Sequence, residues 1–126
     1  SDTYGQLGND AALSDRDVPT TVTAAASASA LAIGTSHSCA LISGSVKCWG
    51  RDDEGQLGDN SPAANEPEPV NVATVSGVAA IAAGAKHTCA VQTAGEVYCW
   101  GQDSAGQLGN GAGATSQGTP DLVTGL

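Results

Sequence analysis

The chain alternates short apolar runs with glycine, proline and polar residues, a pattern that predicts β-strands rather than helices. Residues 37–42 and 45–49 form two such runs with Ser43-Gly44 between them. A two-residue loop with glycine in its second position is typical of a β-hairpin. Residues 70–72 and 78–84 form two further runs ahead of a second hairpin, whose loop is one residue longer. We therefore expect four short strands in each unit and an all-β fold.

A repeat of about fifty residues organises these runs. Gly-Gln-Leu-Gly occurs at 5–8, 55–58 and 106–109, at spacings of 50 and 51 residues. Other residues recur in the same register: Pro19, Pro69 and Pro120; Gly34 and Gly84; His37 and His87; Cys39 and Cys89; Cys48 and Cys99; Trp49 and Trp100. Four short strands in a repeat of this length predict a β-propeller blade, which is a four-stranded antiparallel sheet, or a related stack.

The repeat divides the chain into two complete units with partial pieces on either side. We expect residues 1–18 to be the tail of a preceding repeat and a linker, 19–68 to be the first blade, 69–119 the second, and 120–126 the first strand of a following repeat. An isolated strand this short is not stable in water. Residues 120–126 are therefore expected to pair with a sheet edge from outside the two units, either in further blades or in a further copy of the chain.

The hairpin register brings the cysteines together in pairs. A turn centred between Ser43 and Gly44 places Cys39 opposite Cys48, and the same count in the second unit places Cys89 opposite Cys99. Directly opposed residues in antiparallel strands are close enough for a disulfide. Four cysteines permit three connectivities, and this geometry favours pairing within each repeat.

Metal binding and catalysis are the alternatives for these cysteines. His37, Cys39 and Cys48 would lie together on one sheet face and could hold zinc, although no fourth ligand recurs in register. A catalytic cysteine fits less well, because twin copies at equivalent positions indicate a structural part.

The other recurring side chains are expected to be structural. His37 and His87 could act as general bases, but no partners recur beside them to form a triad, so we expect buried rings hydrogen-bonded to the backbone of a neighbouring loop. Leucine should plug the seam between blades, glutamine should bond the backbone, the glycines should permit left-handed turns and tryptophan should fill the space between blades. These residues are Trp49, Trp100, Gly55, Gln56, Leu57, Gly58, Gly106, Gln107, Leu108 and Gly109. The acidic segments 15–17 and 52–54 could supply oxygens to calcium, but neither has the spacing of a calcium loop.

Charge restricts the classes of partner. Four lysines and arginines against 13 aspartates and glutamates give the 126-residue chain a net charge of −9. Nucleic acids attract clustered cations, which this sequence lacks, so a nucleic-acid partner is not expected. No run is long and apolar enough to predict insertion into a membrane.

The repeat resembles that of the regulator of chromosome condensation family. The resemblance rests on His-Ser-Cys-Ala-Leu at 37–41, Gly-Ser-Val-Lys-Cys-Trp-Gly at 44–50 and Glu-Gly-Gln-Leu-Gly at 54–58, with matching segments at 87–91, 95–101 and 106–109. It covers nearly the whole chain and implies that the two blades are part of a larger, seven-bladed propeller. The paired cysteines depart from the eukaryotic repeat and resemble the bacterial, exported variety, which implies an extracytoplasmic location: secreted, periplasmic or at the cell surface.

Function is expected to be binding. Family members include a nucleotide exchange factor for a small GTPase and secreted inhibitors of β-lactamases, so the resemblance implies a non-catalytic module that binds a protein partner through loops on one rim. The alternative is a structural surface or appendage protein whose repeats assemble between chains. An enzyme is ranked third, behind the two non-catalytic roles, because the sequence shows no constellation of acid, base and nucleophile. No cofactor is expected.

Overall fold

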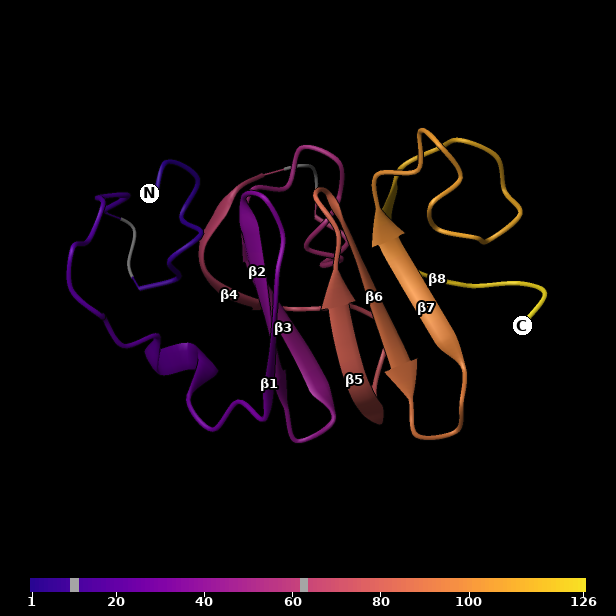
Figure 1. The fold of residues 1–126 in the computed structure, drawn as a ribbon, viewed down its shortest axis with the longest axis horizontal. Coiled ribbons are helices and arrows are strands. Elements are labelled where there is room, and N and C mark those ends of the chain that lie inside the picture. Colours follow the sequence, from indigo (N-terminus) through magenta and orange to yellow (C-terminus); the bar gives the residue numbers. More distant parts are fainter. Residues whose placement is uncertain (10–11, 62–63) are drawn as a thin grey trace.

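The computed structural model describes residues 1–9, 12–61 and 64–126. Its strands form two four-stranded antiparallel sheets. Sheet 1 contains β1 (Ala30–Ile33), β2 (His37–Ile42), β3 (Ser45–Gly50) and β4 (Glu66–Asn71), and sheet 2 contains β5 (Val78–Ala83), β6 (His87–Gln92), β7 (Val97–Gly101) and β8 (Gln117–Leu122). A short 3-10 helix, η1 (Thr23–Ala25), precedes sheet 1. The strands in each sheet follow chain order (Figure 1). The expected all-β fold with two four-stranded blades is confirmed.

The first hairpin turn explains the register of sheet 1. Ser43 and Gly44 have φ angles of 50° and 81°. Positive φ at both central residues is the condition for a type I′ turn, whose twist matches that of the strands it joins. Cys39 therefore lies opposite Cys48, as the sequence predicts, and the same register places Leu41 opposite Val46.

The outer strand of each sheet differs from expectation. β8 pairs with β7 of the same sheet, with Tyr98 opposite Leu122, so the prediction that this part of 120–126 pairs outside the two units is wrong. β4 likewise pairs with β3 and crosses the boundary expected between residues 68 and 69. The physical reason is proximity, because the outer edge of each hairpin is the first unpaired strand edge that the returning chain meets.

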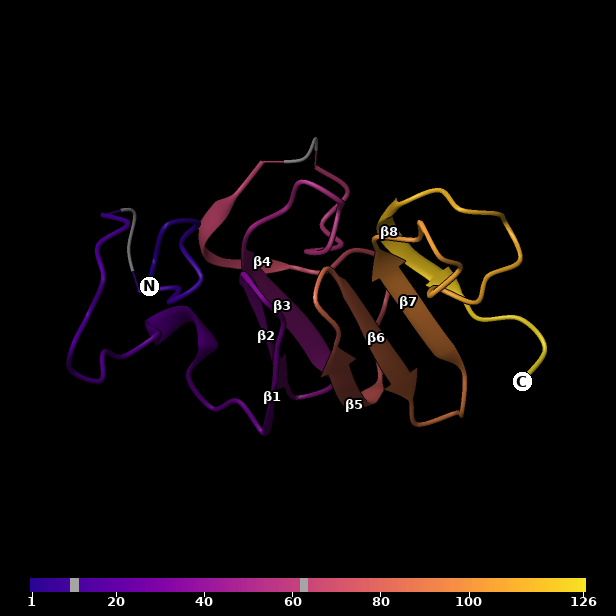
Figure 2. The ribbon, with the colours of Figure 1, turned by 45° about the horizontal axis from the view of Figure 1, so that its top comes forward.

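The two sheets stand side by side and bury a common core at the seam between them (Figure 2). Leu41 and Val46 of sheet 1 pack in one cluster with Leu57, Val78 and Trp100. Among the backbone hydrogen bonds that join the two blades, Thr35 N donates to Ala85 O at 3.1 Å and Val78 N donates to Gly44 O at 2.9 Å. The two sheets are therefore joined by apolar contacts along the seam and by backbone hydrogen bonds at its two opposite ends.

The N-terminal segment lies on the other side of sheet 1, at the left of Figure 1. Within the described residues, no helix has the length and apolar character that crossing a membrane would require.

Candidate binding surface at the blade seam

Each hairpin carries a disulfide. Cys39 is bonded to Cys48 and Cys89 to Cys99, with the Cα atoms 4.1 Å apart in both pairs. This is the pairing that the hairpin register predicts. Because the sulfur atoms are bonded to each other, the thiolates needed for the alternative zinc site and for a catalytic cysteine are not present.

A buried histidine links the two blades through a side chain. His37 Nε2 lies 2.9 Å from Thr88 Oγ1, and the Thr88 hydroxyl donates to Gln56 O at 3.1 Å. The hydroxyl therefore accepts from the imidazole, whose proton is on Nε2. This corrects the expectation that the ring bonds backbone, since a threonine hydroxyl stands between the ring and the carbonyl. Burial, with a smaller effect from the charge of His87, lowers the pKa of His37 to about 4, so the ring is neutral at pH 7.

The same arrangement recurs around the N-terminal loop, but only in part. Ser38 and Trp49 both donate to Gln6 O at 3.0 Å, as Thr88 and Trp100 donate to Gln56 O. Within the described residues, His87 has no hydrogen-bond partner that corresponds to the partner of His37. His87 is half-buried, on the side of sheet 2 that faces away from the seam.

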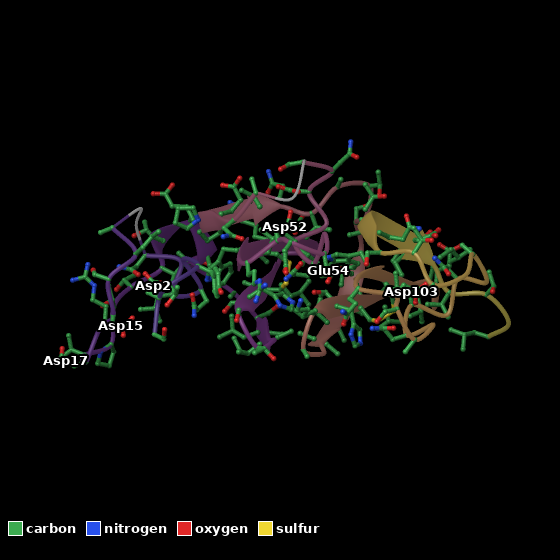
Figure 3. All side chains as sticks on the ribbon, turned by 90° about the horizontal axis from the view of Figure 1, so that it is seen from above. Asp2, Asp15, Asp17, Asp52, Glu54 and Asp103 are labelled. Atoms are coloured by element: carbon green, nitrogen blue, oxygen red, sulfur yellow. A yellow bond between two sulfur atoms is a disulfide. The ribbon has the colours of Figure 1, made fainter. Side chains whose placement is uncertain are left out.

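The Gly-Gln-Leu-Gly loops are held in place by aspartates that the sequence interpretation missed. Asp2, Asp52 and Asp103 are buried, and the Oδ1 atom of each accepts from the backbone N–H of the leucine five residues later at 2.8 to 2.9 Å. Figure 3 shows the three carboxylates spread along the molecule, one to a loop. Their recurrence at spacings of 50 and 51 residues was available as a signal in the sequence.

Glutamine, leucine and glycine complete these loops. The Gln56 and Gln107 side chains each accept from the backbone N–H two residues earlier at 2.8 Å, while Leu57 and Leu108 are buried. Gly58 has a φ of 70° and its Cα faces the Trp100 indole, where a Cβ would lie 2.6 Å from Nε1. This position requires glycine for both its backbone conformation and the close approach of the ring.

The Asp52 carboxylate is in an unfavourable environment. Its Oδ2 atom is buried and, like those of Asp2 and Asp103, has no hydrogen-bond partner in the described part of the chain. Burial raises the pKa of Asp52 to about 6, and the negative charges of Asp59, Glu66 and Asp53 add to that rise, while the bond from Leu57 N opposes it.

Asp52→Asn should stabilise the protein at neutral pH, by about 1–3 kcal/mol. Asparagine keeps an oxygen for Leu57 N and removes the buried charge. Because the folded pKa of Asp52 is raised, its charge destabilises the fold fully above pH 6, and this effect is lost as the pH falls towards 4. Unfolding in urea from pH 4 to 8 should show the advantage of the variant growing with pH. A difference that is constant across this range would contradict the account.

Asp52→Ala is the matched variant for that measurement. It also removes the charge, but it leaves the buried N–H of Leu57 without an acceptor, which costs about 1–3 kcal/mol. Alanine should therefore be less stable than asparagine at every pH.

The upper rim of the blades carries a cluster of paired charges at the seam. We use this name for the edge at the top of Figure 1, with turns 34–36 and 84–86 and loops 51–61 and 102–116. Asp53 accepts from Arg51 at 2.6 Å and from Lys86 at 3.3 Å, and Glu54 pairs with Lys86 at 3.4 Å. The two pairs made by Lys86 join the first blade to the second, because Lys86 precedes β6.

A cavity of about 230 Å³ opens beside this cluster. Thr35, Ser36, Arg51, Lys86 and Gln102 line it with Gln56 and Ala85, so both blades contribute hydrogen-bonding groups. The suggested calcium segment 52–54 has a different arrangement, in which Asp52 is buried in its loop and the other two acids bind cationic side chains. In the described residues, no group of three histidine, cysteine or acidic side chains is placed to hold a metal ion. The surface offers hydrogen-bonding groups from both blades where the blades meet.

The family model described as the regulator of chromosome condensation (RCC1) repeat matches residues 43–91 and 94–126, more than half of the chain. The chain belongs to the regulator of chromosome condensation repeat family. A second model with the same description matches residues 78–107. No curated protein sequence matches the chain significantly.

Solved structures show the same fold. Yeast RCC1 (Prp20) in its complex with Kap60 superposes with a TM-score of 0.81 at 24% identity, over 98% of this chain and 32% of that one. Prp20p from Saccharomyces cerevisiae, in a study of its binding to Gsp1p and histones, gives 0.82 at 24% identity over 99% and 33%. Human WBSCR16 gives 0.76 at 22% identity over 98% and 33%. This RCC1-repeat chain thus spans about one third of the length of each, and its two four-stranded sheets match propeller blades of this family, consistent with a larger seven-bladed propeller.

Proposed function

We propose that this chain is a non-catalytic protein-binding module that contacts its partner through the upper rim. The observation that carries the proposal is the contrast between the two parts of each blade. The sheets are fixed by disulfides and by the bonds across the seam. The loops on one rim, by contrast, differ in sequence outside their shared Asp and Gly-Gln-Leu-Gly positions, and they gather around a cavity lined by several hydrogen-bonding side chains. Loops held on a rigid scaffold are the usual place for recognition.

The comparisons support binding as the general role. Yeast RCC1 (Prp20) is described with Kap60 bound to it, and Prp20p is described by its binding to Gsp1p and histones. Those partners belong to those proteins. What this chain shares with them is the fold, and its own rim residues would determine its own partner.

The rim favours a polar partner surface. Arg51 and Lys86 are already paired with Asp53 and Glu54, so the cluster presents both signs of charge together with the amide of Gln102. A charged side chain of the partner could take the place of one member of an existing ion pair. Such an exchange contributes more to the orientation and specificity of binding than to its affinity.

The two disulfides support an oxidising compartment. Disulfides persist in secreted, periplasmic and cell-surface proteins and are rare in the cytosol. We therefore propose an extracytoplasmic location. After the source cells are quenched in acid, alkylation of the denatured protein at neutral pH should find all four cysteines protected until a reductant is added, and free thiols would argue against this location.

The binding proposal is tested by site-specific photo-crosslinking in extract from the natural source. A photo-reactive residue replaces Ser104 on the upper rim in one variant and Ala94 on the opposite rim in the other, since both side chains are exposed. We expect a discrete crosslinked protein from position 104 only. The same products from both positions, or none from position 104, would refute the proposal.

Charge reversal then locates the contact. Lys86→Glu should weaken binding of the captured protein at least tenfold, because it removes the cation beside the cavity. Lys47→Glu is the matched control, since Lys47 lies in the middle of β3 and away from the rim. Equal effects of the two substitutions would place the contact elsewhere.

A further inference from the structure

The cavity between the two blades on the upper rim concentrates the positive charge of the chain. The sequence has four lysines and arginines, and two of them, Arg51 and Lys86, line this cavity of about 230 Å³. Among the described residues, no acidic side chain lines it, although Asp53 and Glu54 pair with these two cations. The cavity is therefore a positive site on a chain whose net charge is −9.

Several hydrogen-bond donors in the cavity have no protein partner. In residues 1–9, 12–61 and 64–126, the hydroxyls of Thr35 and Ser36 bond to no other group. The Lys86 ammonium group reaches Asp53 at 3.3 Å and Glu54 at 3.4 Å, whereas a well-formed bond from an ammonium group to a carboxylate is about 2.8 Å long. An ammonium group has three N–H donors, so these two long bonds leave it able to bind another acceptor.

Arg51 presents its guanidinium group in a defined orientation. Its Nη2 atom donates to Asp53 at 2.6 Å, and its Cζ atom lies 4.9 Å from the centre of the Tyr4 ring. A guanidinium group has five N–H donors in one plane, so a stacked ring and one ion pair leave donors for a second carboxylate. The backbone holds the base of this side chain in place, because Arg51 N donates to Ser36 O at 2.8 Å.

The two cations are close enough together for one carboxylate to bridge them. Asp53 Oδ2 already accepts from both Arg51 and Lys86. The backbone fixes this spacing across the blades, since Thr35 N donates to Ala85 O at 3.1 Å beside Lys86. A carboxylate that enters the cavity would meet the same pair of cations.

We propose that this cavity binds one carboxylate group of the partner protein, from an aspartate or glutamate side chain, between Arg51 and Lys86. The inference rests on the proposed function, because it names the chemistry by which the upper rim recognises its partner. The carboxylate oxygens accept from the guanidinium and ammonium groups, and the hydroxyls of Thr35 and Ser36 donate to the remaining lone pairs. Each of these four side chains lines the cavity.

The charge around the cavity restricts what else the partner carries. Asp53 and Glu54 are partly exposed on the rim, and the chain as a whole is acidic. A nucleic acid or a run of acidic residues is repelled by such a surface, because like charges placed across an interface weaken binding. The ligand is therefore a lone carboxylate flanked by positive side chains, which face the acids of the rim.

Two capped tripeptides test this inference. Ac-Lys-Glu-Lys-NH2 and Ac-Lys-Gln-Lys-NH2 differ only in the carboxylate, and each is titrated into the isotopically labelled chain while the amide signals of Ser36, Arg51 and Lys86 are followed by NMR. Attraction by net charge alone predicts tighter binding of the glutamine peptide, which carries one more positive charge. We expect the opposite order, with a dissociation constant of about 1–10 mM for the glutamate peptide and a value at least about threefold higher for the glutamine peptide.

Variants of the charged residues locate the carboxylate. Lys86→Gln and Arg51→Gln should each abolish the preference for the glutamate peptide. Lys47→Gln removes the same charge in the middle of β3, away from the rim, and should keep the preference. Asp53→Asn should increase the preference at least about twofold, because it frees both cations from their present partner. If Arg51→Gln does not fold, Lys86→Gln decides the result.

Equal binding of the two peptides to the wild-type chain, or tighter binding of the glutamine peptide, would overturn the inference. A preference that survives Lys86→Gln would also overturn it. Crosslinking from position 104 does not depend on the peptides, so the two proposals fail separately. A protein captured there without a peptide preference would keep the rim as the binding surface and remove the carboxylate, and a preference without a captured protein would keep the carboxylate site and refute the proposed function.

Discussion

Replacing all four cysteines with alanine should lower the free energy of unfolding by about 4–6 kcal/mol, at about 2–3 kcal/mol for each disulfide. The bonded cysteines are only 9 and 10 residues apart, so each bridge restricts a short hairpin in the unfolded chain. A small domain is typically stable by about 5–15 kcal/mol, so this loss leaves the chain close to unfolding. Urea titration followed by tryptophan fluorescence measures it.

The two blades can be separated in that experiment. Cys39→Ala with Cys48→Ala, and Cys89→Ala with Cys99→Ala, should each show about half of the loss. The first pair is wholly buried at the seam, and it should have the larger effect because alanine also leaves space there. Double variants within about 0.5 kcal/mol of the wild-type chain would show that the bridges add little to this fold.

Leu57→Ala should lower the free energy of unfolding by about 2–5 kcal/mol. Leu57 is completely buried, and it packs with Trp100 and the residues of sheet 1 in the seam cluster. Shortening it leaves a cavity where the two blades meet, and the surrounding strands are held too firmly to close it. The same urea titration gives the change.

Leu122→Ala is the control for Leu57. Leu122 is 42% exposed at the end of β8, and its replacement should change the free energy by less than about 0.5 kcal/mol. A loss for Leu57→Ala as small as this would mean that loop 55–58 is not a part of the core.

The hairpins and disulfides could be predicted because a short turn leaves little freedom. Once Ser43 and Gly44 are placed at the turn, the pairing of Cys39 with Cys48 follows by counting. The number of blades followed in the same way from the repeat. These predictions depend on contacts between residues close in the sequence.

The outer strands could not be assigned in this way. Periodicity shows the length of the repeat but not the point at which a sheet begins, and β4 has two prolines and two acids in Glu-Pro-Glu-Pro, a weak strand pattern. Its place is fixed by the open edge of β3, which is a tertiary contact. The partner of His37 was missed for the same reason, since Thr88 belongs to the other blade.

The buried aspartates are a different case. Asp2, Asp52 and Asp103 recur as regularly as the glycines, so the sequence contained the signal, but acidic residues beside one another in 52–54 were interpreted as possible calcium ligands. Only the Oδ1 bonds to the leucine N–H groups distinguish a structural carboxylate from its exposed neighbours.

Native-state hydrogen exchange at two amides tests most directly whether the two blades form one rigid support for the rim. The N–H groups of Thr35 and Val78 donate across the seam, to Ala85 O and Gly44 O. If the blades open only together, these amides should exchange as slowly as those of Cys39 and Leu41 in the centre of β2. Exchange at the rate of exposed loops, while β2 and β6 stay protected, would show that the blades move independently and would contradict the account.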